Sequence, residues 1–171
     1  MRKLLVLFIL SLALKGYAQK EPGVVQIIDD LTIRWDREAI SLKFYQGILD
    51  FCATEAYRKE VVDLLDNIHH LDTTLYFIVQ EKYAVKKDKE AEATLEDILK
   101  LETDYPTEKF KHFIQEECAL LKEIEKNFES ESPKEFERDM KAFEKELVKY
   151  VNSITYRIDI IDEHIHHLHL E

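Results

Sequence analysis

Apolar residues recur along most of the chain at alternating intervals of three and four residues, which is the spacing of one face of an α-helix. One such series is Tyr57, Val61, Leu64, Ile68, Leu71, Leu75 and Ile78. A longer series runs from Phe136 to Leu168. After residue 18 the chain has two glycines and three prolines, too few turn signals for a sheet of many strands. The pattern therefore predicts an all-α protein.

We expect four long helices, over about residues 22–52, 55–86, 89–129 and 133–168. The sequence Ser132-Pro133-Lys134-Glu135 marks the start of the last helix, because it has the residues of a capping box with proline at the first helical position. Pro106 should kink or break the third helix, since proline removes a backbone donor. Short connections make consecutive helices antiparallel, so we expect a single-domain, up-down-up-down four-helix bundle over residues 19–171.

The first 18 residues have the pattern of a secretory signal peptide. A basic start, Met1-Arg2-Lys3, precedes an eleven-residue segment, Leu4 to Leu14, in which only Ser11 is polar, and small residues precede Gln19. The alternative is a membrane anchor, but a membrane-spanning helix needs about 20 apolar residues. We therefore expect cleavage after Ala18, an extracytoplasmic location in the periplasm or outside the cell, and no membrane anchor after processing.

The mature chain is strongly acidic. Removing residues 1–18 lowers the count of Lys and Arg from 24 to 21 and leaves all 35 Asp and Glu, so the formal net charge changes from −11 to −14. Nucleic-acid binding depends largely on pairing Lys and Arg with phosphates. The composition therefore argues against a nucleic-acid partner and permits a basic one.

Two cysteines remain after cleavage, Cys52 and Cys118. An oxidising compartment permits a disulfide between them, whereas two separate buried thiols are the alternative. Their heights in the predicted bundle are similar, which favours the bond. Helices one and three of a square bundle are diagonal, however, and a disulfide needs Cα atoms within about 7 Å, which argues against it.

The first predicted helix has a second apolar side, formed by Ile33, Ile40, Phe44 and Phe51. A helix that is apolar on two sides is either buried on both or exposed at an interface. This side could be covered by the N-terminal segment, or it could contact a protein partner or a second copy of the chain.

Several charged residues fall at positions where the helical stripes should be apolar, namely Glu38, Asp72, Glu102 and Arg157, with His69 and His164 close by. Estimated heights place them in one layer of the bundle. One interpretation is a buried ionic network of Glu38, Asp72, Glu102 and Arg157. The other is a dinuclear metal centre with Glu38, His69, Asp72, Glu102 and His164 as candidate ligands, although the Glu-x-x-His motif of such centres occurs only once.

The chain ends in IDEHIHHLHLE, which contains four histidines. Ile165 and Leu168 interrupt the histidines at positions that continue the apolar stripe, so the segment is predicted to be native helix and not a purification tag. Asp162, His166 and His169 follow one another at steps of four and three and form a candidate surface site for zinc or copper. A histidine-rich helix end without a physiological metal is the alternative.

No catalytic signature is present: the chain lacks a Gly-x-Ser-x-Gly turn and a glycine-rich phosphate loop. The sequence thus favours a non-catalytic binding or interaction protein of unknown ligand. The alternative is a metal-binding bundle that uses inward carboxylates, the C-terminal histidines, or both.

Overall fold

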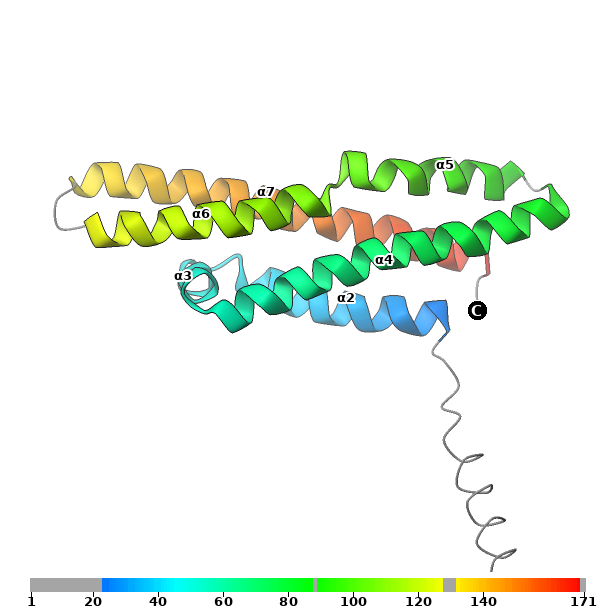
Figure 1. Ribbon diagram of the computed structural model, residues 1–171, viewed down its shortest axis with the longest axis horizontal. Helices are drawn as coiled ribbons and strands as arrows, with labels where there is room; N and C mark the ends of the chain where they lie inside the picture. The colour runs from blue at the N-terminus through cyan, green and yellow to red at the C-terminus, as the bar shows by residue number, and fades with distance from the viewer. Residues whose placement is uncertain (1–22, 88, 128–131, 170–171) are drawn as a thin grey trace, which may run out of the picture.

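The computed structural model describes residues 23–87, 89–127 and 132–169, and all regular secondary structure in these ranges is helical. The helices are α2 (Val24–Ser41), α3 (Tyr45–Ala53), α4 (Glu55–Lys86), α5 (Lys89–Asp104), α6 (Thr107–Asn127) and α7 (Pro133–His167). They form an elongated bundle (Figure 1), so the all-α prediction is confirmed. The predicted signal peptide lies outside the described residues. None of the described helices combines the length and apolar character needed to cross a membrane.

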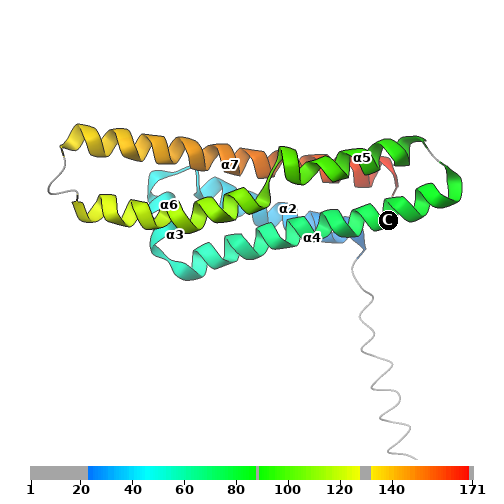
Figure 2. The ribbon, with the colours of Figure 1, turned by 45° about the horizontal axis from the view of Figure 1, so that its top comes forward.

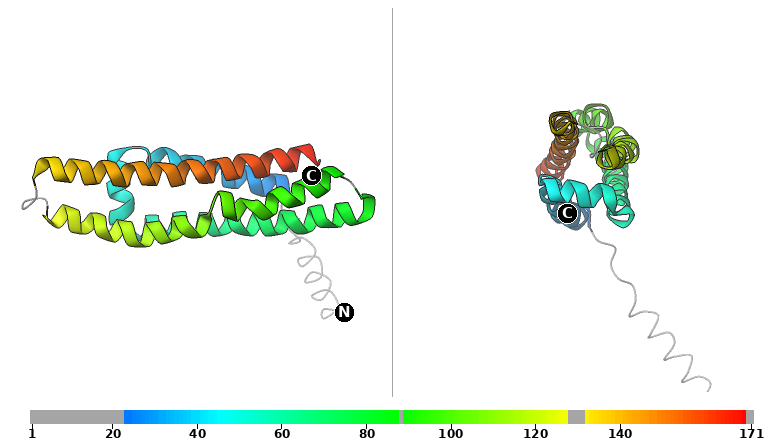
Figure 3. Two further views of the ribbon diagram at one scale, coloured as in Figure 1. Left: turned by 90° about the horizontal axis from the view of Figure 1, so that it is seen from above. Right: turned by 90° about the vertical axis from the view of Figure 1, so that its left-hand side faces the viewer.

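The first predicted helix is two helices, so the single helix expected over residues 22–52 is wrong. After α2 ends at Ser41, the chain turns and α3 lies across the axis of the bundle (Figure 3, right). Gly47 permits this turn, because a Cβ atom at this position would collide with the carbonyl oxygen of Ser41. Because Gly47 has no side chain, the start of α3 can pack closely against the end of α2.

The third predicted helix is also two helices, and this break lies at the proline, as expected. α5 ends at Asp104, and α6 begins at Thr107 on a shifted axis (Figure 2). The other two predictions agree with the structure to within a residue or two. The capping box of α7 is present, since the Ser132 hydroxyl accepts from the Glu135 N–H and the Glu135 carboxylate accepts from the Ser132 N–H.

The core is continuous and contains apolar residues from all six helices. At its centre the Phe110 ring stacks on Tyr150, with ring centroids 5.2 Å apart, and meets the edge of Trp35. The Trp35 indole N–H donates to the Thr155 hydroxyl at 3.0 Å, which connects α2 to α7. Beyond α3, the second half of α6 and the first half of α7 extend as a two-helix arm (Figures 1 and 3).

Cys52 and Cys118 form a disulfide, with Cα atoms 4.9 Å apart. The bond is possible because α3 crosses the bundle and brings Cys52 to α6. A straight first helix would have kept Cys52 on the opposite side of the bundle, and that was the geometric argument against the bond. The break near Gly47 therefore decides between the two alternatives.

Candidate functional site

The most buried charged residue in the described part of the chain is Arg157 of α7, which is completely inaccessible to solvent. Its Nη1 donates to Glu102 Oε2 and to the Tyr105 carbonyl oxygen, both at 2.7 Å. Its Nη2 pairs with the Asp72 carboxylate of α4. Arg157 therefore connects α4 and α7 to the end of α5 and to the residue that follows it.

The break at Pro106 explains why these residues converge. The helix ends at Asp104, so the Tyr105 carbonyl lacks a helical partner and accepts from Arg157. At the start of α6, the Thr107 hydroxyl donates to Glu102 at 2.8 Å. We call Asp72, Glu102, Tyr105, Thr107 and Arg157 the Arg157 network.

The two carboxylates of the Arg157 network have opposite pKa shifts. Burial raises the pKa of Asp72 to about 6, even though Arg157 favours its ionised form. Burial also acts to raise the pKa of Glu102, but hydrogen bonds from Arg157, Thr107 and the Glu108 N–H outweigh it and lower the pKa. Asp72 Oδ1 and Arg157 Nε have no hydrogen-bond partner within the described residues.

Glu38 does not belong to this network, in contrast to the prediction. It is buried beside Arg37, whose Nε donates to Glu38 at 2.7 Å and whose Nη2 donates to Glu60 of α4 at 2.8 Å. The prediction that Glu38 shares a layer with Asp72 required residues 22–52 to run alongside α4 as one helix. Because only α2 does so, Glu38 lies near the start of α4 and far along the helix from Asp72.

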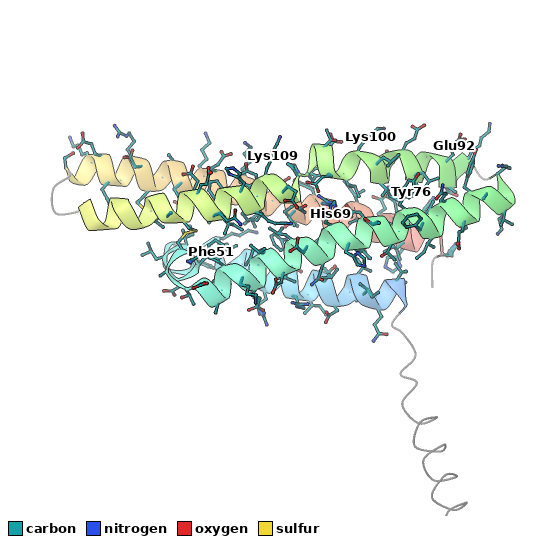
Figure 4. All side chains as sticks on the ribbon, viewed as in Figure 1. Phe51, His69, Tyr76, Glu92, Lys100 and Lys109 are labelled. Atoms are coloured by element: carbon teal, nitrogen blue, oxygen red, sulfur yellow. A yellow bond between two sulfur atoms is a disulfide. The ribbon has the colours of Figure 1, made fainter. Side chains whose placement is uncertain are left out.

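The candidate dinuclear centre is not assembled either. His69 faces the α5–α6 break (Figure 4), with its Nδ1 3.3 Å from Glu102 Oε2, so His69, Asp72 and Glu102 do lie close together. Arg157 pairs with both Asp72 and Glu102, and its positive charge opposes the binding of a metal ion there. His164 lies farther along α7, 3.5 Å from the Thr94 hydroxyl and 3.7 Å from Asp97. Across the described residues, no three His, Cys, Asp or Glu side chains are gathered so that they could hold a metal ion as they stand.

The C-terminal histidines point to two different sides of α7. His166 Nε2 lies 3.2 Å from Asp162. His169 is beyond the helix end, with a φ of 49°, so the helical spacing behind the surface-metal prediction does not extend to it, although it lines one cavity with His166. His164 and His167 instead face α5, where His167 contacts Glu90.

The pairing of His164 and His167 with Asp97 and Glu90 of α5 was not predicted from the sequence. A signal was available in the spacing of these residues. Glu90 and Asp97 are seven residues apart and so share one side of α5, and His164 and His167 are three apart and share one side of α7.

Three of the four residues on the second apolar side of the first helix are exposed. Ile33 is 71% exposed, Ile40 58% and Phe44 65%. Phe51 was wrongly assigned to this side, because α3 rotates it into the core, where it is fully buried against the edge of Tyr57. We call Ile33, Ile40 and Phe44 the α2 face.

No protein-family model, curated protein or solved structure matches this chain.

Proposed function

We propose that this protein is an exported, non-catalytic binding protein that contacts a protein partner through the α2 face. The exposure of Ile33, Ile40 and Phe44 is the observation that carries the proposal. The opposite side of α2 is fixed in the core through Trp35 and its hydrogen bond to Thr155. Ile33 and Ile40 are thus presented by a helix that is anchored in the core, and Phe44 follows in the turn between α2 and α3.

The residues beside the α2 face indicate the chemistry of the partner. Asp29 and Asp36 are exposed and alternate with Ile33 and Ile40 at steps of four and three, so their carboxylates flank the two isoleucines. An apolar centre with a charged rim is the common anatomy of a protein interface. We expect the partner surface to combine an apolar patch with Lys or Arg residues.

Export is supported by two independent features. The first 18 residues have the signal-peptide pattern, and the chain carries the Cys52–Cys118 disulfide, a bond typical of oxidising compartments. Mass spectrometry of the protein from an exporting bacterial host tests this part. A mature chain beginning at Gln19 supports export, and retention of residues 1–18 in the cytoplasm contradicts it.

Site-specific photo-crosslinking in the exporting host tests the partner surface. A photoreactive residue at position 33 or 40 should give a discrete adduct, and the same residue at position 77 should not. Phe77 is a matched control because it is 58% exposed, like Ile40, but lies on α4 outside the α2 face. The variants Ile33→Asp and Ile40→Asp should abolish the adduct formed from the other position.

The mass of the adduct identifies the class of partner. An adduct of twice the chain mass identifies a homodimer, and any other discrete mass identifies a heterologous protein. Equal labelling from positions 33 and 77, or none from 33 and 40, overturns the proposal. Light scattering over a wide concentration range checks the homodimer independently, since Ile33→Asp should dissociate it.

A further inference from the structure

Two carboxylates of α5 face two histidines of α7 outside the Arg157 network, and all four side chains line one cavity between the helices. Asp97 Oδ2 lies 3.7 Å from His164 Nε2, and Glu90 contacts His167. The Thr94 hydroxyl of α5 lies 3.5 Å from His164 Nδ1. Each carboxylate–histidine pair joins two helices, and we call Asp97–His164 and Glu90–His167 together the histidine clasp.

The C-terminal end of α5 is held by a permanent charge. Glu102 Oε2 accepts from Arg157 Nη1 at 2.7 Å, and the Arg157 side chain is fully buried. His69 of α4 lies 3.3 Å from the same carboxylate oxygen and strengthens this contact when it is protonated. A guanidinium is protonated at any physiological pH, whereas histidine ordinarily titrates near a pKa of about 6.5. This end of α5 therefore always meets a cation, and the histidine clasp meets one only when its imidazoles are protonated.

The charges around the histidine clasp come from α4, α5 and α7. Among the described residues that line its cavity there is no Lys or Arg, and the carboxylates are those of Glu90, Asp97 and Glu163. An adjoining cavity shares Glu90, Glu163 and His167, and its other basic groups are Lys82, Lys86, His166 and His169. Nearby carboxylates stabilise a protonated imidazole, and nearby cations destabilise it. His164, which is 19% exposed and lines only the first of these two cavities, is therefore the stronger member of the clasp.

We propose that the histidine clasp fastens α5 to α7 when His164 and His167 are protonated and loosens at neutral pH, while Arg157 holds the other end of α5 in place. Protonation converts each contact between a neutral ring and a carboxylate into a charge-assisted one, which is stronger. Ala91 and Ile98 are buried on the inner side of α5. Loosening of the clasp therefore gives water access to an apolar side of α5 that is covered at acidic pH.

Amide hydrogen exchange of the mature chain, residues 19–171, tests the histidine clasp when it is followed by NMR at pH 5.5 and pH 7.5. This range spans the ordinary titration of histidine and lies above that of Asp and Glu. The measured quantity is the protection of residues 93–98 divided by that of α2, after correction for the intrinsic pH dependence of exchange. The α2 reference is needed because Asp72, with a pKa of about 6, changes the stability of the whole bundle in the same range. The ratio should be about fivefold higher at pH 5.5, the scale of two weak ion pairs.

Matched variants identify the histidines responsible, and circular dichroism verifies the fold of each. His164→Gln/His167→Gln should remove the pH response of the ratio. His112→Gln/His166→Gln is the control and should keep the response, because each of these histidines lies 3.2 Å from a carboxylate of its own helix and joins no two helices. His164→Lys/His167→Lys has permanent charges and should show the acidic ratio at both pH values. His167→Gln alone, at a position that is 66% exposed, should reduce the response to about threefold and replaces the double variant if that variant unfolds.

Several outcomes overturn the proposal. An equal pH response in α5 and α2 shows that only the stability of the whole bundle changes. A full response in His164→Gln/His167→Gln, or an equal loss in the control variant, shows that the clasp is not its source. A full response in His164→Lys/His167→Lys excludes imidazole protonation as the cause. The variant Ile33→Asp of the α2 face should keep the wild-type response, so this proposal and the proposed function fail independently.

Discussion

Replacing Arg157 by methionine should be one of the most destabilising single changes in the bundle. The side chain is fully buried and makes charge-assisted hydrogen bonds to Asp72, Glu102 and the Tyr105 carbonyl. Each bond to a charged group contributes about 1.5–3 kcal/mol. The sum overstates the loss, because Asp72, whose pKa is already raised to about 6, can take up a proton, and Glu102 can turn to solvent. We therefore expect a loss of about 3–5 kcal/mol, as for other buried pairs that lose one partner.

Urea unfolding at pH 7.5, followed by circular dichroism, measures this loss as a difference in the free energy of unfolding. A second variant tests the cause. Adding Asp72→Leu to Arg157→Met removes the carboxylate that the first change leaves unpaired, so the double variant should recover at least about 1 kcal/mol. A loss below about 1 kcal/mol for Arg157→Met, or no recovery in the double variant, would refute the view that burial makes this pairing obligatory.

Three further predictions concern the disulfide, pH and the corrected first helix. Replacing both Cys52 and Cys118 by serine should lower the free energy of unfolding by about 4 kcal/mol, because the bond closes a loop with a sequence separation of 66; urea unfolding of both proteins checks this value. Asp72 has a folded-state pKa of about 6, above its unfolded value, so its stabilising contribution is complete below about pH 4 and is lost as the pH rises through 6. The free energy of unfolding of the wild type, relative to that of Asp72→Asn, should therefore fall by about 1–3 kcal/mol between pH 4 and pH 7. Phe51→Ala should lower the free energy of unfolding by about 3–5 kcal/mol, and Phe44→Ala should lower it by less than about 0.5 kcal/mol. Similar losses for the two variants would contradict the placement of Phe51 in the core.

Much of the fold could be predicted from periodicity, because long apolar stripes and a capping box are local features. The starts of α4 and α7 and the break at Pro106 agree with those expectations. The break after Ser41 was not predicted, because the interval between α2 and α3 has no proline or glycine. The break is permitted by the close approach of Gly47 to Ser41, a contact that only the folded structure reveals.

The errors that involve the first predicted helix follow from that single break. An unbroken first helix places Glu38 opposite Asp72, Phe51 on the outer side and Cys52 across the bundle from α6. Once α3 turns, Glu38 pairs with Arg37, which also binds Glu60, while Phe51 enters the core and Cys52 bonds to Cys118. Charged residues on a stripe indicate that a polar contact exists, but the register between helices decides which residues meet.

The seam between α5 and α7 shows how the helix breaks distribute the polar contacts of the bundle. At one end of α5, Glu102 accepts from the guanidinium of Arg157, which is buried and has no access to solvent. At the other end, Asp97 lies beside His164 and Glu90 contacts His167, and the positive charge of an imidazole depends on its protonation. The pairing between α5 and α7 therefore relies on a permanently charged guanidinium at the arginine end and on protonation of the imidazoles at the histidine end.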